Sequence, residues 1–268
     1  MQSTPPDPRH ELAALTRGLK YAARRAGHMG QRRARTGVDS ALPSPTAPSE
    51  APSLENSPVP QADSRPLAPP EQAAGTLPTS ASELTDLPSL REAVAGCQAC
   101  DICQTRTQTV FLDGDGTSGV LFVGEAPGQN EDEQGVPFVG PEGSLLTDII
   151  EKGMGLKRSE VAITNVLKCH PPGNRDPLAG EKAACTPWLE RQIELLDPKV
   201  VIALGQPAAG YLLDSDAPLA QMRGRVLDWK GRKLVATYHP AFLLRSPESK
   251  RDCWQDIQMA MGVLQQGE

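Results

Sequence analysis

Four short apolar runs, rich in β-branched residues, follow one another along the second part of the chain. The runs span residues 120–123, 161–166, 200–204 and 234–238, and helical patterns cover residues 82–95, 144–154, 180–196, 206–213 and 250–265. Apolar strands that alternate with helices are typical of a parallel sheet covered on both faces. We therefore expect an α/β fold, a three-layer α/β/α sandwich around a central four-stranded parallel sheet.

Each run leads into a residue suited to a binding site. Gly124 follows the first run, Asn165 lies at the end of the second, Gly205 follows the third and His239 the fourth. In open parallel sheets, ligands bind beyond the carboxyl ends of the strands. We expect these four residues to meet at one edge of the sheet.

The first 86 residues differ in composition from the rest. They hold 13 of the 26 prolines, one aromatic residue (Tyr21) and no cysteine. Such a segment cannot bury enough apolar surface to offset the entropy of ordering it. We expect residues 1–35 to form a short basic arm, residues 36–86 a disordered linker, and residues 87–268 the folded domain.

The arm itself has a helical pattern over residues 11–25. Leu12, Leu15 and Leu19 fall on one face, with arginine and lysine elsewhere. Two interpretations stay open: a binding element for a protein partner, or a frayed helix without a fixed role.

Membrane and secreted classes are not favoured. No run of about 18 apolar residues is present, so we expect no membrane span. The N-terminus lacks the charged start and apolar core of a signal peptide. We expect a cytoplasmic monomer, located with the nucleoid DNA if the source is bacterial.

Net charge gives a divided picture. The total is −6, but residues 1–40 carry eight basic against three acidic residues (+5), residues 41–86 one against six (−5), and residues 87–268 eighteen against 24 (−6). Binding of nucleic acid would therefore need local positive charge in the folded part, with the arm free to contact phosphates.

The cysteines form a spaced cluster. Cys97, Cys100 and Cys103 are separated by two residues each, Cys169 and Cys185 lie downstream with 15 residues between them, and Cys253 stands alone. In the cytoplasm, clustered cysteines bind metal or react more often than they form disulfides. A four-thiolate site is favoured, and zinc and a 4Fe-4S cluster both fit it. Cys253 is most simply a buried core thiol.

Five segments in order resemble one known family. They are the Cys-x2-Cys pair, GEAPGQNEDEQGVPFVGPEG (124–143), NVLKCHPPGNRDP (165–177), Cys185 and TYHPAFLLR (237–245). Together they resemble the family-4 uracil-DNA glycosylases, the iron-sulfur members of the uracil-DNA glycosylase superfamily. The resemblance covers roughly residues 90–264 and leaves the first 86 residues aside.

The resemblance implies a 4Fe-4S cluster. Its ligands would be Cys97, Cys100, Cys169 and Cys185, because the family's Arg-Thr pair then matches Arg106-Thr107; Cys103 would lie outside the cluster. The implied role is to hold loops together rather than to shuttle electrons in catalysis.

The resemblance also implies a pocket for a flipped base. Phe138 would stack on the uracil ring, and Asn165 would read it, since one amide offers a donor for O4 and an acceptor for N3–H. Cytosine presents the reverse pattern. Gly124 and Ala126 would line the pocket, and Ala126 stands where better-known superfamily members carry a catalytic aspartate.

Three residues are expected to act on the bond. His239 would stabilise negative charge developing at O2 of the leaving uracil. Glu131 would stabilise the attacking water or the sugar cation, and Glu125 would lie in the pocket wall beside it.

Residues 239–245 resemble the family's minor-groove wedge. Phe242 and Leu244 are candidates for the apolar tip, and Arg245 for a phosphate contact. Asn174, Arg175 and Lys168 are expected near the DNA backbone.

We therefore expect a monofunctional uracil-DNA glycosylase that acts on single- or double-stranded DNA in base-excision repair. The alternative is an iron-sulfur protein that binds uracil-DNA or abasic sites with little or no turnover. Covalent attachment through a histidine in a basic insertion is not expected, because the segment after Cys169 is short.

Overall fold

The computed structural model describes residues 81–266. They belong to one unit, Ala74–Glu268. The predictions for the arm and for the linker up to residue 80 lie outside the described residues. The last linker residues are described: a 3-10 helix, Ala81–Glu83, precedes Leu84, whose carbonyl accepts a hydrogen bond from Arg191 Nε at 2.7 Å. Ordered chain thus begins before residue 87.

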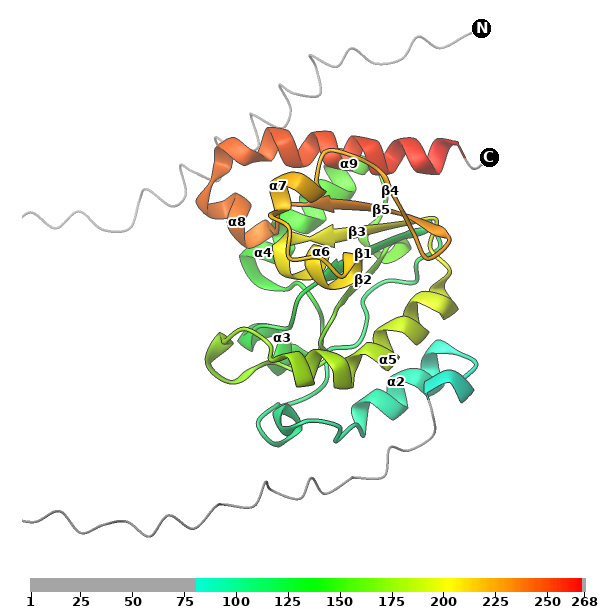
Figure 1. The fold of residues 1–268 in the computed structure, drawn as a ribbon, viewed down its shortest axis with the longest axis vertical. Helices are drawn as coiled ribbons and strands as arrows, with labels where there is room; N and C mark the ends of the chain where they lie inside the picture. Colours follow the sequence, from blue (N-terminus) through cyan, green and yellow to red (C-terminus); the bar gives the residue numbers. More distant parts are fainter. Residues whose placement is uncertain (1–80, 267–268) are drawn as a thin grey trace, which may run out of the picture. The chain divides into compact units, whose positions relative to one another are not determined.

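A five-stranded sheet, in the order β2-β1-β3-β5-β4, forms the centre (Figure 1). Its strands are β1 (Val120–Gly124), β2 (Ala162–Asn165), β3 (Val200–Leu204), β4 (Leu227–Trp229) and β5 (Arg232–Thr237). β4 pairs antiparallel with β5, and the other pairs are parallel. The three-layer sandwich is confirmed, but the prediction of four strands is wrong, because a fifth strand adds an antiparallel edge.

The fifth strand is short and carries a weak pattern. Its middle residue, Asp228, is exposed, and only Trp229 is buried. Lys230 and Gly231 turn the chain with φ angles of 46° and 78°, which is the two-residue hairpin geometry. Three residues with a central charge do not form an apolar run, so this strand was not predicted from the sequence.

Helices cover both faces of the sheet. One face packs against α2 (Leu87–Ala95), α5 (Ala179–Leu196), α6 (Gly205–Leu213) and α7 (Leu219–Met222). The other packs against α4 (Gly140–Asp148) with its π-helical continuation (Ile149–Met154), α8 (Pro240–Arg245) and α9 (Lys250–Gln265). Figure 1 shows α9 on one side of the sheet and α5 and α2 on the other.

The strands are apolar throughout because both of their faces are buried. In β1, Leu121 and Val123 pack toward α5, whereas Val120 and Phe122 pack toward α4 and α9. All five residues of β1 and of β3 are buried. This arrangement explains the continuous runs from which the parallel sheet was predicted.

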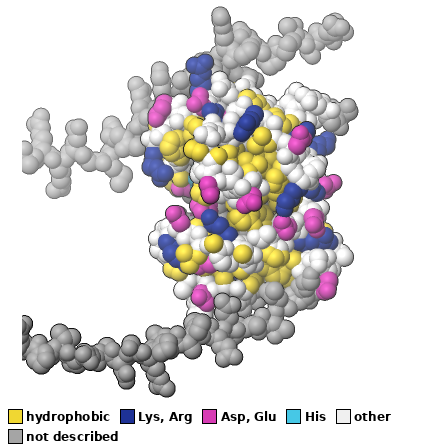
Figure 2. Space-filling model, in the orientation of Figure 1, with side chains coloured by type: hydrophobic (Ala, Val, Ile, Leu, Met, Phe, Trp, Pro, Cys, Tyr) yellow, Lys and Arg dark blue, Asp and Glu magenta, His cyan; other side chains and the backbone are white. Residues whose placement is uncertain are grey.

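The surface is mixed in charge. On the face shown in Figure 2, lysine and arginine side chains lie among aspartates and glutamates rather than in one basic field. Within residues 81–266, no helix combines the length and the apolar character needed to cross a bilayer.

Candidate functional site

A cleft of about 940 Å³ opens at the carboxyl ends of the parallel strands. Nine of the ten residues predicted for catalysis, for base binding or in the wedge segment line it: Glu125, Ala126, Glu131, Phe138, Asn165, His239, Phe242, Leu244 and Arg245. They come from the segment after β1, the end of β2, the end of β5 and α8, so the expected convergence at one sheet edge is present. The tenth residue, Gly124, lies at the end of β1, paired in register with Asn165.

Asn165 forms a buried polar point in the cleft wall. Its side chain is 2% exposed, and its Oδ1 has no hydrogen-bond partner among the described residues. Leaving a buried acceptor unpaired typically costs about 1–3 kcal/mol, so such an atom marks a place for a ligand donor. Gly124 keeps that place open: a Cβ there would lie 2.3 Å from Asn165 Oδ1 and 2.6 Å from Phe138 Cζ.

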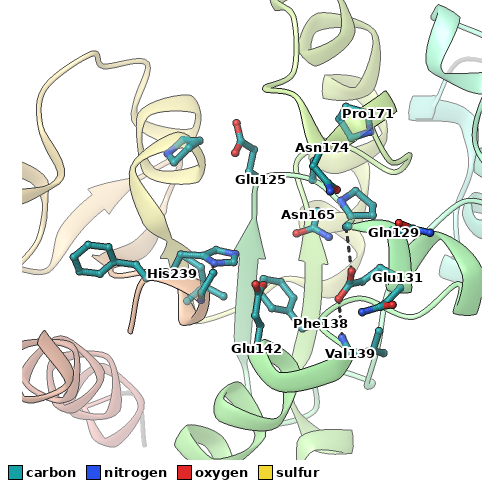
Figure 3. Close-up of a pocket in the computed structure, with 18 of the residues that line it drawn as sticks. Glu125, Gln129, Glu131, Phe138, Val139, Glu142, Asn165, Pro171, Asn174 and His239 are labelled. Carbon is teal, nitrogen blue, oxygen red and sulfur yellow. Dashed lines mark hydrogen bonds between the residues drawn. The ribbon is translucent and has the colours of Figure 1, made fainter. Parts of the chain in front are cut away.

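Phe138 and His239 close the cleft around the Asn165 amide. Their ring centroids are 5.4 Å apart with an interplanar angle of 36°. Figure 3 shows Phe138, Asn165 and His239 turned toward the same space from three separate segments. Phe138 is buried and has a φ of 54°, in the left-handed region that aromatic residues rarely adopt.

His239 is held as a neutral ring with a defined proton. It caps α8, where its Nδ1 accepts a hydrogen bond from the Ala241 amide at 3.2 Å. The ring proton is therefore on Nε2, available as a donor. Burial, and secondarily the charge of Arg245, lower the pKa of His239 from 6.5 to about 4.

The carboxylates of the cleft have different environments. Glu131, on α3 (Gln129–Gln134), accepts from two backbone amides, Gly128 N at 3.1 Å and Val139 N at 2.9 Å (dashed lines in Figure 3). Burial, with a smaller contribution from Asp176, raises the pKa of Glu125. Glu131 is thus fixed between two loops, whereas the environment of Glu125 disfavours its charged form.

Several cleft residues were not anticipated: Gln129, Asn130, Glu142, Pro171 and Pro207. Glu142 is the most notable, because it is a third carboxylate, in the first turn of α4. Burial, with an added effect of Glu131, raises its pKa. Its position immediately after the Phe138 loop was the available signal, since a helix that starts beside a cleft points its first turn into it.

The expected wedge loop is a short helix, α8. Leu243 is 1% exposed and packs in the core, whereas Phe242 and Leu244 are 36% and 43% exposed. Phe242 also stacks on Tyr238, with ring centroids 5.0 Å apart. Leu244 is therefore the freer apolar side chain at the cleft mouth.

Of the three residues expected near the DNA backbone, two lie at the surface. Asn174 and Arg175 line the cleft and are exposed. The expectation for Lys168 is wrong: it is 1% exposed, and its Nζ donates to Thr164 Oγ1 at 2.8 Å and to the Asn165 carbonyl at 2.7 Å. Lys168 thus supports the strand end that carries Asn165.

Five cysteines line one small interior cavity: Cys97, Cys100, Cys103, Cys169 and Cys185. All six cysteines of the chain are free thiols. Cys97 and Cys100 follow α2, Cys103 lies in the 3-10 helix Asp101–Gln104, Cys169 follows β2, and Cys185 lies in α5. Three segments that are distant in sequence therefore line the same cavity.

This donor set fits a four-thiolate cluster. Arg106 Nη1 donates to Cys169 Sγ at 3.3 Å, and Lys168 also lines the cavity. A guanidinium that donates to a ligand sulfur is the kind of neighbouring group that stabilises an anionic iron-sulfur cluster. Among residues 81–266, no three cysteine, histidine or acidic side chains surround a single metal-ion position.

Comparisons with known proteins show to which family the chain is similar. A model of the uracil DNA glycosylase superfamily matches residues 111–258. The chain is 39% identical over 182 residues to the type-4 uracil-DNA glycosylase of Sulfurisphaera tokodaii, covering 65% of this chain and 83% of that protein. It is 41% identical over 177 residues to the type-4 uracil-DNA glycosylase of Thermotoga maritima, covering 65% and 92%.

A third type-4 uracil-DNA glycosylase, from Pyrobaculum aerophilum, is 40% identical over 185 residues, covering 66% of this chain and 94% of that protein. The type-5 enzyme of the same organism is 31% identical over 130 residues, covering 48% and 56%. The chain therefore belongs to the uracil-DNA glycosylase superfamily and, within it, to the type-4 family.

Proposed function

We propose that this protein is a monofunctional uracil-DNA glycosylase of base-excision repair. It hydrolyses the N-glycosidic bond of uracil in single- or double-stranded DNA, releases free uracil and leaves an abasic site. The observation that carries the proposal is the buried, unpaired Oδ1 of Asn165, which lines an open cleft together with Phe138 and His239 in the described part of the chain.

These side chains of the cleft account for the selection of the base. The flipped base stacks on Phe138, a contact typically worth about 1–3 kcal/mol. Asn165 Oδ1 accepts N3–H of uracil, and its amide donates to O4. Cytosine offers an acceptor and a donor in the reverse order, so it leaves both groups of a buried amide unpaired.

Bond cleavage leaves negative charge on the departing uracil. The neutral His239 donates its Nε2–H to O2 as that charge develops, and the backbone amide of Ala241 fixes this tautomer. Glu131 supplies a fixed negative charge for the cationic sugar, oriented by its two backbone hydrogen bonds, and Glu125 lines the pocket.

DNA contacts surround the cleft. Leu244, with Phe242 beside it, fills the vacancy in the stack, and Arg245 contacts phosphate at the cleft rim. Residues 1–35 form a basic arm that adds nonspecific affinity or binds a protein partner, and residues 36–80 link it to the folded domain. The protein acts as a monomer in the cytoplasm, where its thiols stay reduced.

Cys97, Cys100, Cys169 and Cys185 would hold a 4Fe-4S cluster in this proposal. Such a cluster supplies a covalent cross-link between the end of α2, the segment after β2 and α5, and so fixes the strand end that carries Asn165. Iron and acid-labile sulfide, with visible absorption from sulfur-to-iron charge transfer, are expected in the purified protein. Stoichiometric zinc without iron would contradict the cluster.

The function is tested by uracil release from an oligonucleotide without added metal. Asn165→Ala and His239→Ala are each expected to lower the single-turnover rate by about 10²-fold or more, because removing one stabilising donor of this kind typically costs that much. Full activity in both variants would overturn the proposal. Thermal unfolding of each variant shows whether a slower rate comes from the site or from a damaged fold.

A further inference from the structure

The loop that carries Phe138 is fixed by a residue outside the cleft. Arg158 lies in the 3-10 helix Arg158–Glu160, just before β2, and does not line the cleft. Its guanidinium makes five hydrogen bonds, to Asp113 Oδ2 (2.8 Å), Thr147 Oγ1 (2.9 Å), and the carbonyls of Gly143 (3.3 Å), Pro137 (2.9 Å) and Phe138 (3.1 Å). Five is the full donor capacity of an arginine side chain.

Arg158 and Glu131 form hydrogen bonds with opposite ends of the same peptide unit, and we call this arrangement the grip. The Phe138 carbonyl accepts from Arg158 Nη2, and the amide of the next residue, Val139, donates to Glu131 Oε1 at 2.9 Å. Fixing the C=O and the N–H together fixes the plane of that peptide and hence ψ of Phe138. The bond from Arg158 Nη2 to the Pro137 carbonyl holds the preceding peptide, whose plane sets φ of Phe138. Charged partners on both sides make these bonds stronger than neutral ones.

Such a grip is needed because the backbone of Phe138 is strained. Its φ of 54° typically costs a non-glycine residue about 1–3 kcal/mol and persists only where the surroundings enforce it. Gly143 permits the approach, since a Cβ there would lie 1.7 Å from the Phe138 carbonyl oxygen. Without the grip, the loop would relax and carry the ring away from Asn165.

The anchor behind Arg158 is itself rigid. Asp113 exchanges two backbone hydrogen bonds with Ile163 of β2, at 3.0 and 2.9 Å. The Arg158 side chain is 19% exposed and that of Asp113 30%, so the ion pair is partly shielded from water. Because Arg158 is bonded to Asp113, and Asp113 to β2, the position of Phe138 is fixed relative to the strand that carries Asn165.

We propose that Arg158 is a positioning residue for base recognition, which acts through Phe138 by holding the peptide unit between residues 138 and 139. The predicted effect on uracil release rests on the proposed function, whereas the predicted effect on amide exchange in the loop does not. Asp113 orients Arg158, and Glu131 completes the grip from the cleft side.

The structural arm of the test is hydrogen exchange in residues 137–143. Arg158→Met should speed amide exchange there by about tenfold or more, since removing a net bond of about 1.4 kcal/mol has that effect. The matched control is Arg232→Met. Arg232 is 20% exposed, pairs with Asp197 at 2.7 Å and lies at the start of β5, at the opposite end of the sheet. Unchanged exchange of residues 137–143 in Arg158→Met would overturn the proposal, whether or not the protein is active.

The kinetic arm is a double-mutant cycle with Phe138→Ala. Arg158→Met should lower kcat/KM for uracil release by about 10- to 100-fold in the wild-type background, the cost of a misplaced reacting group. In the Phe138→Ala background it should have almost no further effect, because the ring that it positions is gone. Equal effects in both backgrounds would overturn the proposal. A wild-type protein without uracil release would instead overturn the proposed function.

Arg158→Lys separates positioning from charge. Lysine keeps the ion pair with Asp113 but cannot reach five acceptors in a fixed fork. We expect Arg158→Lys to resemble Arg158→Met in both exchange and kinetics. Wild-type exchange and kinetics in Arg158→Lys would show that Arg158 only neutralises Asp113, and would contradict the proposed positioning role.

Discussion

A single side chain, His239, shows how the surroundings select one chemical form. Burial disfavours the cation, Arg245 adds to that effect, and the Ala241 amide occupies Nδ1. The result is a neutral donor rather than an acid. A cation would place a full charge beside Arg245, whereas in the proposed mechanism the neutral ring leaves Nε2–H to meet an anion that exists only during the reaction.

This form of His239 gives a pH dependence with a definite sign. Its pKa in the folded protein, about 4, lies below the ordinary 6.5. The active neutral ring therefore persists down to about pH 5, and the rate of bond cleavage should fall as the pH falls through about 4. Folding stability should also decline as the pH drops below 6.5, because the unfolded chain then binds more protons. A single-turnover rate that falls as the pH rises through 6.5 would show a cationic histidine instead.

Residue types could be predicted from the sequence, but their states could not. Asn165 and His239 follow from motif positions at strand ends, and Phe138 from its place in the segment 124–143. The tautomer of His239, the strain at Phe138 and the double hydrogen bond of Glu131 depend on the folded arrangement of the loops around them. Lys168 shows the same limit, since an isolated lysine beside a cysteine gives no sign of complete burial.

Among the elements, α8 packs one face in the core and exposes the other at the cleft. Leu243 packs in the core beneath β5, and Leu244 and Phe242 face outward at the cleft mouth. Pro240 starts the helix at a position where its missing N–H costs nothing. The proposed wedge is therefore a turn of helix that Leu243 attaches to the core.

Neighbouring leucines of α8 provide a matched pair of variants. Leu244→Ala should leave the unfolding free energy within about 0.5 kcal/mol, because the side chain is exposed. It should slow uracil release from duplex DNA by about tenfold, and less from single strands, where no vacancy needs filling. Leu243→Ala should cost about 2–5 kcal/mol of stability by opening a core cavity. Equal loss of stability in the two variants, by urea denaturation, would contradict this division.

Elements that are long or fully buried were predictable. β3 and α9 match their predicted ranges because a continuous apolar run and a long amphipathic pattern are strong signals. β4 and α8 were missed for opposite reasons. β4 is too short to show a pattern, and the His239-Pro240 pair at the start of α8 indicated a loop, although proline also favours a first helical turn.

At the scale of the whole molecule, the face of the folded part shown in Figure 2 carries side chains of both charges. Recognition of DNA by this part would then rest on the cleft and a few rim contacts rather than on a bulk field. The eight basic residues within residues 1–40 are the densest positive segment of the sequence. The proposal divides specificity and nonspecific affinity between two parts of one chain.

Deleting residues 1–40 tests this division. The slope of log K against log salt should become shallower by about 0.9 for each phosphate of duplex DNA that the arm no longer neutralises, because fewer counterions are released on binding. Deleting residues 41–80, an equally long segment with one arginine and four acidic residues, is the matched control and should not flatten the slope. An unchanged slope without residues 1–40 would reject the role of the arm.

The most direct measurement of the central claim is the identity of the base released from DNA. Oligonucleotides with one uracil, cytosine or thymine at the same position are incubated with the wild-type protein and with Asn165→Asp. We expect the wild type to release uracil alone. Asn165→Asp should lose most of that rate and gain slow release of cytosine, because a carboxylate accepts from the cytosine amino group and no longer donates to O4. A wild-type protein that releases no uracil, or a base preference that Asn165→Asp leaves unchanged, would contradict the account.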